Sequence, residues 1–305
     1  DSSSLPVRPY SHPAPESPSA QTGRRLRPCA RKVNDHLYRM YYCIVVNNYI
    51  KTGGLTYDGS WSERAFIGVM ETSDPASNNW EDKGFVICSS SDKGTNWNRA
   101  SEGDWNAYFK FNAIDPSFII TPEGEHWLIY GSWHSGIAAV QLNPETGKTL
   151  AELPKSYGTA AEIAPYGKLI FTRTNGGRWQ GAEAPEIVYH DGYYYLFLAY
   201  DGLDIPYNTR VLRSTKVDGP YETLNGAVTD ASKGANNNPT VLTHPYKFSE
   251  GYGWVGISHC AVFDDGNGNW YYASQQRFPA NVGGNAYSNA IMMGGVRSIQ
   301  WESNG

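Results

Sequence analysis

The sequence has little of several features that mark particular protein classes. Its 305 residues include only 4 methionines, and no run of 18 apolar residues is present that could cross a membrane. The net charge of -5 is spread along the chain, so the one-sided basic surface that nucleic-acid binding needs is missing. We therefore expect no membrane span and no nucleic-acid partner, and a neutral, polar partner fits the charge better.

Cysteine is also scarce. Cys29, Cys43, Cys88 and Cys260 are far apart and lack the close C-x-x-C spacing of a zinc or redox site. We interpret them as scattered buried thiols, with disulfide bonds as the open alternative.

The abundant residues favour an all-β fold. The chain contains 32 Gly, 18 Pro, 22 Tyr and 10 Trp, a composition typical of short aromatic strands joined by tight turns. One phrase, a polar turn followed by an aromatic and aliphatic run, recurs along the chain. Its five copies are NDHLYRMYYCIV from Asn34, GEHWLIYGSW from Gly124, GKLIFTRT from Gly167, DGYYYLFLAY from Asp191 and GNGNWYYASQQ from Gly266.

Five copies of a hairpin phrase predict a five-bladed β-propeller. The run Tyr193–Tyr200 has no polar alternation, so both faces of that strand should be covered by neighbouring sheets. The competing fold, a β-sandwich, predicts strands that alternate polar and apolar residues, and most of these do not.

Two carboxylates precede prolines at the expected starts of strands. Asp115 stands before Pro116 in FNAIDPSF, and Glu183 precedes Ala184 and Pro185 in GAEAPEI. Because proline pushes the residue before it into an extended conformation, we expect both acids to be held rigidly near one end of the propeller channel. Two carboxylates across a groove are what glycoside hydrolysis requires, about 6.5 to 9.5 Å apart in inverting enzymes. The alternative for Asp115 is that Asp-Pro merely opens a turn.

Aromatic and polar residues around these acids suit a carbohydrate groove. Trp133, inside GSWHSGI, and Trp105 are candidates for stacking on sugar rings, although tryptophans also pack blades together. His259 in GISHCAVF is a candidate for the channel, with a satisfied core histidine as the alternative.

Five phrases, in this order, resemble the arabinanases of glycoside hydrolase family 43. They are NAIDPSF, YGSWHSGIAAVQLNPETGK, EAPEIVYHDGYYYLFLAY, YNTRVLRSTKVDGPY and SHCAVFDDGNGNWYYASQQRF, and the resemblance runs from about Val33 to the end. GSWHSGI after an IDP motif resembles the endo-acting α-1,5-L-arabinanases. The family also contains exo-acting α-L-arabinofuranosidases and β-xylosidases.

The resemblance implies a five-bladed propeller and an inverting hydrolase acting on a polysaccharide of the arabinan or arabinoxylan class, secreted or periplasmic. Glu183 matches the general acid, and Asp115 matches the aspartate that orients the acid and raises its pKa. His259 matches the histidine that helps to hold calcium in the channel through water. We expect substrate contacts from Asn112, Trp105, Trp133, Ser135 and Arg210.

The third acid, the general base, is not found. In the family it is an aspartate in a His-Asp-Pro phrase, and the corresponding position here is Arg27 in Leu26-Arg27-Pro28. Arginine cannot deprotonate water. Either residues 1–32 are an atypical segment, out of frame or disordered, which we favour, or the chain is a carbohydrate-binding propeller that does not cleave. Residues 33–305 are the expected catalytic propeller, which we predict to be truncated at its C-terminus.

Overall fold

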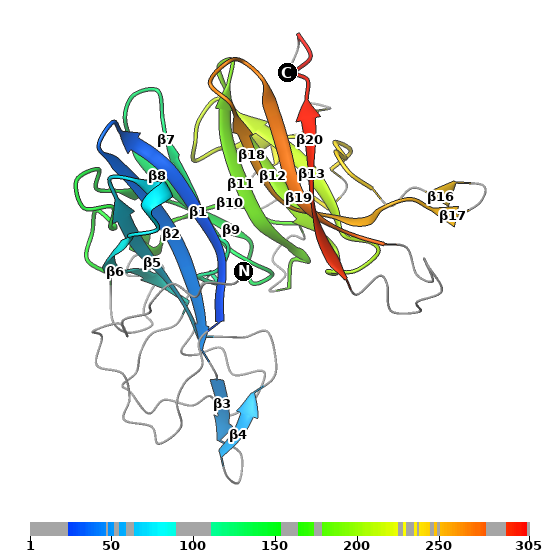
Figure 1. Ribbon diagram of the computed structural model, residues 1–305. Helices are drawn as coiled ribbons and strands as arrows, with labels where there is room; N and C mark the ends of the chain where they lie inside the picture. The colour runs from blue at the N-terminus through cyan, green and yellow to red at the C-terminus, as the bar shows by residue number, and fades with distance from the viewer. Residues whose placement is uncertain are drawn as a thin grey trace. The chain divides into compact units, whose positions relative to one another are not determined.

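The computed structural model shows an all-β protein (Figure 1). It describes residues 24–46, 48–51, 55–58, 64–89, 111–153, 164–173, 179–224, 228–229, 235–236, 238–244, 247–248, 251–278 and 291–303. The helices in these ranges are the single turns η1 (Pro75–Ser77) and η2 (Ala164–Tyr166). The predicted fold class is confirmed. In the same ranges there is no helix with the length and apolar character needed to cross a membrane.

The first sheet is an antiparallel meander near the start of the chain. It contains β1 (Arg24–Asn34), β2 (Leu37–Val46), β5 (Arg64–Thr72) and β6 (Glu81–Cys88), paired in that order. The short hairpin of β3 (Asn48–Lys51) and β4 (Leu55–Asp58) follows β2 in the chain. A tight turn joins β1 to β2, where Asn34 Oδ1 accepts a hydrogen bond from the backbone N–H of His36 at 2.9 Å. β1 begins at Arg24, so the first sheet starts before residue 33, where the sequence analysis placed the start of the propeller.

The second sheet has the order β10-β9-β8-β7. Its strands are β7 (Ser117–Ile120), β8 (His126–Tyr130), β9 (Ile137–Leu142) and β10 (Lys168–Phe171). β8 is a central strand, and Leu128, Ile129 and Tyr130 are fully buried in it. The Tyr130 hydroxyl donates a hydrogen bond of 2.5 Å to the backbone carbonyl of Tyr166, so its burial leaves no unmet donor.

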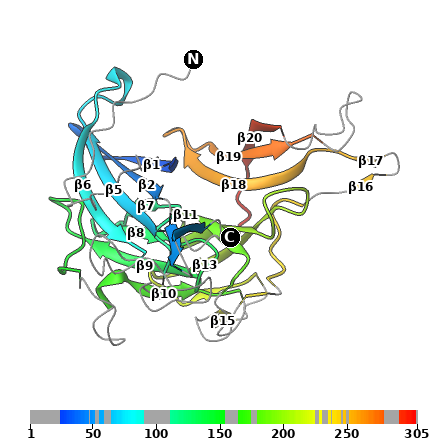
Figure 2. The same ribbon diagram turned by 90° about the horizontal axis from the view of Figure 1, so that it is seen from below.

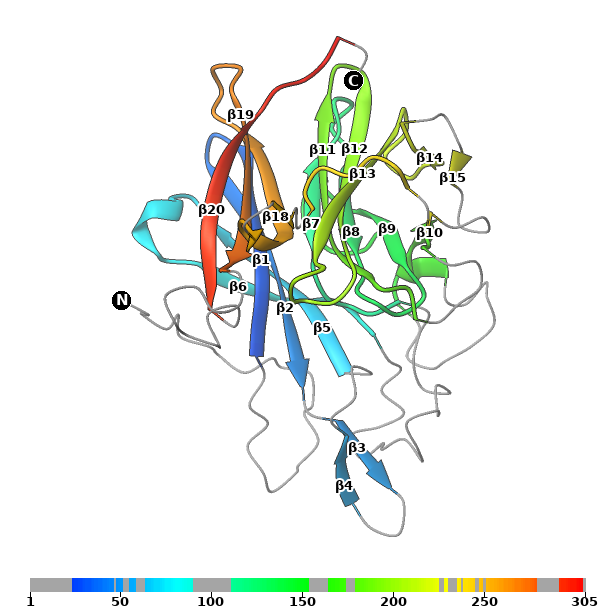
Figure 3. The ribbon, with the colours of Figure 1, turned by 90° about the vertical axis from the view of Figure 1, so that its right-hand side faces the viewer.

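The third sheet lies in the second half of the chain, and β11, β12 and β13 run side by side in it (Figure 3). Its order is β11 (Ala182–His190), β12 (Tyr193–Tyr200), β13 (Asn208–Ser214), β14 (Tyr221–Glu222) and β15 (Val228–Thr229). Asp191 and Gly192, which join β11 to β12, both have positive φ, 44° and 86°, as a two-residue hairpin requires. All residues from Tyr194 to Tyr200 are buried, which confirms that both faces of this strand are covered.

The fourth sheet packs on the third. It consists of β18 (Val255–Asp264), β19 (Trp270–Arg277) and β20 (Met292–Ile299), with β20 beside β19 at its edge (Figure 2). The hairpin of β16 (Lys247–Phe248) and β17 (Gly251–Tyr252) precedes it. The shared core of the two sheets contains Val188, Tyr195, Phe197, Cys260, Val262 and Tyr272. A buried carboxylate adds to this core, because Glu186 Oε1 accepts a hydrogen bond from the backbone N–H of Val262 at 3.2 Å.

The prediction of five blades is wrong for the described part of the chain, which forms four sheets of three or more strands. Four copies of the repeated phrase are β2, β8, β12 and β19, each the second strand of its own sheet. The copy from Gly167 is β10, which is the edge strand of the second sheet. A turn followed by an apolar run describes an outer strand as well as an inner one, since local pattern does not say which sheet a strand joins.

The chain divides into two compact units. One comprises residues 1–134 and 138–168, and the other comprises residues 135–137 and 169–305.

All four cysteines lie in the described part of the chain, where each is buried and forms no disulfide bond. The interpretation of Cys29, Cys43, Cys88 and Cys260 as buried thiols is confirmed. Cys29 has a structural role, because its Sγ accepts a hydrogen bond from the backbone N–H of Phe118 at 3.3 Å and so links β1 to β7.

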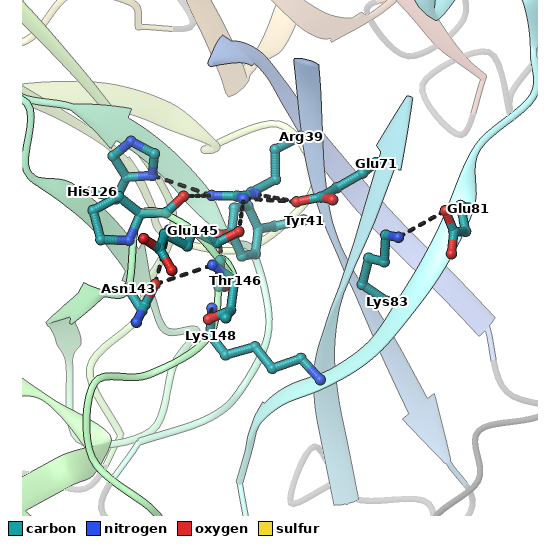
Figure 4. A network of polar contacts seen from close by, with 12 residues as sticks. Arg39, Tyr41, Glu71, Glu81, Lys83, His126, Asn143, Glu145, Thr146 and Lys148 are labelled. Carbon is teal, nitrogen blue, oxygen red and sulfur yellow. Dashed lines mark hydrogen bonds and ion pairs between the residues drawn. The ribbon is translucent and has the colours of Figure 1, made fainter. Parts of the chain in front are cut away.

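A buried arginine joins the first two sheets (Figure 4). The Arg39 guanidinium is fully buried and pairs with Glu71, with Nε and Nη2 lying 2.8 and 2.7 Å from Oε1. Nη1 donates to the carbonyl of Pro144 at 3.1 Å, and Nη2 donates to the carbonyl of Glu145 at 3.2 Å. Nη1 also lies 3.2 Å from Nδ1 of His126 in β8. A buried charge needs such a complete set of partners, so this network sets how the two sheets meet.

The network excludes other residues at Gly147 in the turn after β9. A Cβ added there would lie 2.7 Å from Arg39 Nε, and the φ of +68° also favours glycine. The same glycine accepts a hydrogen bond of 2.8 Å at its carbonyl from the Tyr41 hydroxyl.

We predict that the Arg39 network weakens in acid. Burial and the adjacent Arg39 guanidinium lower the pKa of His126 below the usual 6.5. The unfolded chain therefore binds the proton more readily, and the contribution of neutral His126 to stability is lost as pH falls below 6.5. Between pH 7 and pH 5, the urea concentration at the midpoint of unfolding should decrease less in His126→Gln than in the wild type. The reason is that glutamine accepts a hydrogen bond from Arg39 without titrating.

The control for this experiment is His36→Gln, in an exposed turn of the same sheet. Its pH dependence should equal that of the wild type. An equal pH dependence for His126→Gln and the wild type would contradict the prediction.

Candidate functional site

Three strands that begin a sheet share one backbone irregularity. Asp115 just before β7, Ala184 in β11 and His259 in β18 have φ values of 55°, 53° and 56°. The left-handed region is unfavourable for residues with a Cβ, and its repeated use at ends of strands is typical of functional sites. The next residue is Pro116 or Pro185 in two of the three cases. The prediction that proline holds the preceding residue in an extended conformation is therefore wrong for Asp115, whose strain lies in the left-handed region instead.

The strand ladders slip at two of these places, Ala184 and His259. The register of β11 and β12 shifts between Glu183 and Glu186, and that of β18 and β19 shifts between Ser258 and Ala261. The register of β1 and β2 shifts between Leu26 and Cys29, which brackets Arg27 and Pro28. By its place in β1 and its following proline, Arg27 corresponds to Asp115 and Ala184.

Glu183 stands at the slip in β11 and is half-buried. Its Oε1 accepts a hydrogen bond of 2.5 Å from the hydroxyl of Tyr207, which is fully buried. The Tyr207 hydroxyl also lies 3.3 Å from Nδ1 of His259, which is half-buried in β18. The structure thus brings Glu183 and His259, both predicted from sequence, to the same tyrosine.

Tyr207 is a residue that the sequence analysis missed. It precedes β13 and begins the phrase YNTRVLRSTKVDGPY, but the sequence analysis assigned it no role. Its ring packs against Ala184 and Ala199 in a small buried cluster, and Ala199 is the register partner of Glu183. Only the pairing of β11 with β12 and β13 brings it to Glu183.

Asp115 lies in the first unit, whereas Glu183 lies in the second. Asp115 is 2% exposed, and the carbonyl of the preceding Ile114 accepts a hydrogen bond of 3.0 Å from the backbone N–H of Gly131. The acid is therefore held at the end of the second sheet, as its sequence context predicted.

Asn112 has a buried, bridging position. It is 3% exposed, and its Nδ2 donates to the carbonyl of Ser132 at 3.2 Å. Its Oδ1 lies 3.2 Å from Ser89 Oγ, which can donate to it. These contacts tie the segment before Asp115 to the GSW phrase. Contact of Asn112 with substrate remains a prediction.

The backbone of the segment GSWHSG departs from an extended conformation at several residues. Gly131, Trp133, Ser135 and Gly136 have φ values of 140°, 57°, 61° and 101°. Gly136 cannot be replaced without movement, because an added Cβ would lie 2.1 Å from the carbonyl oxygen of Phe171. Trp133 and Ser135 are half-buried. Their predicted contact with substrate is not tested.

Arg210 is held in the third sheet by polar and aromatic contacts. Its Nε donates to Asn208 Oδ1 at 3.1 Å, and its Nη1 donates to the carbonyl of Asn238 at 2.7 Å. Its guanidinium carbon lies 4.9 Å from the centre of the Tyr200 ring, and that of Arg173 lies 4.8 Å from the same ring. Stacked guanidinium groups of this kind are well ordered and suited to binding polar ligands. Trp105 lies outside the described residues.

The described residues contain no group of three or more His, Cys, Asp or Glu side chains that could hold a metal ion. The contact of His259 with calcium through water stays a prediction. In the structure its Nδ1 lies 3.3 Å from the Tyr207 hydroxyl. Calcium prefers oxygen ligands, which a bridging water supplies.

Known proteins resemble this chain in sequence and in structure. Residues 28–305 match the model of glycosyl hydrolases family 43. The extracellular endo-α-(1→5)-L-arabinanase of Thermotoga petrophila is 33% identical over 184 residues, which cover 55% of this chain and 36% of that protein. The extracellular exo-α-(1→5)-L-arabinofuranosidase of Cellvibrio japonicus is 29% identical over 204 residues, covering 65% and 50%. The matched regions thus span half or less of each curated relative.

A solved structure agrees with these matches. The family 43 endo-arabinanase from Bacillus licheniformis has 26% sequence identity and a TM-score of 0.63, over 92% of this chain and 75% of that one. The architecture is accordingly that of a β-propeller. Because the family model matches residues 28–305, the chain belongs to glycosyl hydrolases family 43.

Proposed function

We propose that this chain is an inverting hydrolase of α-1,5-linked L-arabinan that cleaves the polymer internally. The observation that carries the proposal is the half-buried carboxyl group of Glu183, held at 2.5 Å by Tyr207 in a family 43 chain. The arabinanase relatives support arabinan as the substrate class.

In this proposal Glu183 is the general acid. It donates its proton to the glycosidic oxygen as the bond to the anomeric carbon breaks, and water attacks that carbon from the opposite face. Asp115 orients Glu183 and keeps it protonated, because a nearby negative charge disfavours ionisation of the acid. Trp133, Ser135, Asn112, Trp105 and Arg210 bind the polysaccharide.

Exo action on the same polymer is the alternative within the family. The match to the exo-acting relative from Cellvibrio japonicus covers 65% of this chain. The match to the endo-acting relative from Thermotoga petrophila covers 55% of it. The names of both relatives describe extracellular proteins, which supports secretion or a periplasmic location for this chain. A calcium ion, held by His259 through water, is part of the proposal.

A second function, carbohydrate binding without cleavage, is favoured by Arg27. This residue stands within the register shift of β1, as His259 stands within that of β18, and Glu183 lies at the start of the shift in β11. A guanidinium group there cannot activate water, because it stays protonated at any accessible pH. A propeller with that substitution would retain its groove and lose its base.

We predict that the chain, incubated with linear arabinan, releases long oligosaccharides early in the digest. Release should fall by about 10²-fold or more in Glu183→Ala, since general acid catalysis contributes roughly that factor. Reducing ends and product sizes measure the reaction, and calorimetry measures binding. Binding without release by the wild type would establish the non-catalytic function, and monosaccharide as the sole product would establish exo action.

We further predict that Arg27→Asp raises the rate of arabinan hydrolysis by about 10²-fold, because it places a carboxylate at the position of the missing base. The matched control is Arg31→Asp, which makes the same change of charge in β1 outside the register shift. Equal rates for Arg27→Asp and Arg31→Asp, in folded proteins that bind arabinan, would contradict this assignment of position 27.

A further inference from the structure

We propose that Tyr207 is a positioning residue for Glu183, which fixes one carboxyl oxygen and thereby directs the other toward the glycosidic oxygen. The inference rests on the proposed role of Glu183 as general acid and adds a residue to which the sequence analysis assigned no role.

The hydrogen bond between the two side chains is short. Tyr207 Oη lies 2.5 Å from Glu183 Oε1, within the range of roughly 2.5 to 2.7 Å for a hydroxyl that donates to a carboxylate. Such charge-assisted bonds are about twice as strong as neutral ones. Because the bond uses Oε1, the acid proton in this proposal is carried by Oε2.

Burial makes Tyr207 a rigid donor. Its side chain is fully buried and packs on Ala184 and Ala199, the neighbours of Glu183 in sequence and across the ladder. The left-handed conformation of Ala184 and its lack of a long side chain leave room for this ring beside the strand. The left-handed backbone at Ala184 and the packing of the Tyr207 ring thus occur together beside Glu183.

The loop before Tyr207 is held by its own hydrogen bonds. Asn208 Nδ2 donates to the carbonyl of Pro206 at 2.9 Å and to Asp201 Oδ2 at 2.8 Å. The backbone N–H of Tyr207 lies 3.3 Å from the carbonyl of Asp204, to which it donates. The Tyr207 hydroxyl therefore reaches Glu183 from a constrained loop. Nδ1 of His259 lies 3.3 Å from the same hydroxyl.

A purely structural tyrosine and a positioning tyrosine make different predictions. The first would lower only stability when its hydroxyl is removed. The second would also lower kcat on arabinan with KM unchanged, because misplacement of a catalytic group impairs the transition state more than ground-state binding. A substrate with a good leaving group, such as a nitrophenyl arabinofuranoside, depends less on the acid and should be affected less.

The test is Tyr207→Phe, which removes the hydroxyl and retains the ring. We expect kcat on arabinan to fall by about 10-fold to 100-fold. The basic limb of the pH profile should move to higher pH, since the lost donor stabilises the ionised carboxylate. In the background of Glu183→Gln, Tyr207→Phe should have no further effect on release.

The matched control is Tyr221→Phe. Tyr221 is also fully buried in the second unit, but its hydroxyl donates to the backbone carbonyl of Val217 at 2.8 Å. It should show a comparable loss of stability and unchanged kcat, KM and pH profile.

A readout independent of turnover is the carboxyl ¹³C resonance of Glu183, assigned by its absence in Glu183→Gln. Its titration midpoint should move to higher pH by about one unit in Tyr207→Phe. An unchanged midpoint would overturn the inference whether or not the wild type is active. An inactive wild type with a shifted midpoint would instead overturn the proposed hydrolase activity and uphold the positioning role.

Discussion

The constraint on which the candidate site depends is the left-handed conformation of one residue in, or just before, the first strand of a sheet. At Asp115, Ala184 and His259 this conformation costs energy that the surrounding sheets must offset. The strands at Asp115 and Ala184 are largely buried on both faces, and this burial offsets the cost. In β18 the residues after His259 alternate between buried and exposed, so there the offset comes from the face that packs on the third sheet.

The same principle governs the polar groups in the interior. Arg39 is buried with a carboxylate, a histidine and two carbonyls around its guanidinium, and Glu186 accepts from the backbone of the neighbouring sheet. Both groups form hydrogen bonds across a boundary between two sheets. Such contacts contribute specificity, since a shift of one sheet against the next would leave a buried charge unpaired.

Local sequence patterns predicted individual strands but did not predict how the strands assemble into sheets. The Asp191-Gly192 turn and the uniformly apolar β12 were predictable, because turn chemistry and burial act within a few residues. The number of blades was not, because β10 resembles an inner strand while forming an edge. Glu183 and His259 were found through neighbouring residues in the chain, whereas Tyr207 was missed, because its contact with Glu183 depends on how β11, β12 and β13 pair.

By itself the sequence determined the all-β class, the turns, the family resemblance and the two acids that stand near prolines. It also led to the prediction that Arg27 occupies the place of an expected carboxylate. The tertiary structure alone decided which strands share a sheet and that Tyr207 reaches Glu183. The physical reason is that hydrogen bonds across a sheet join residues far apart in the chain, and their geometry depends on registers that side-chain periodicity does not specify.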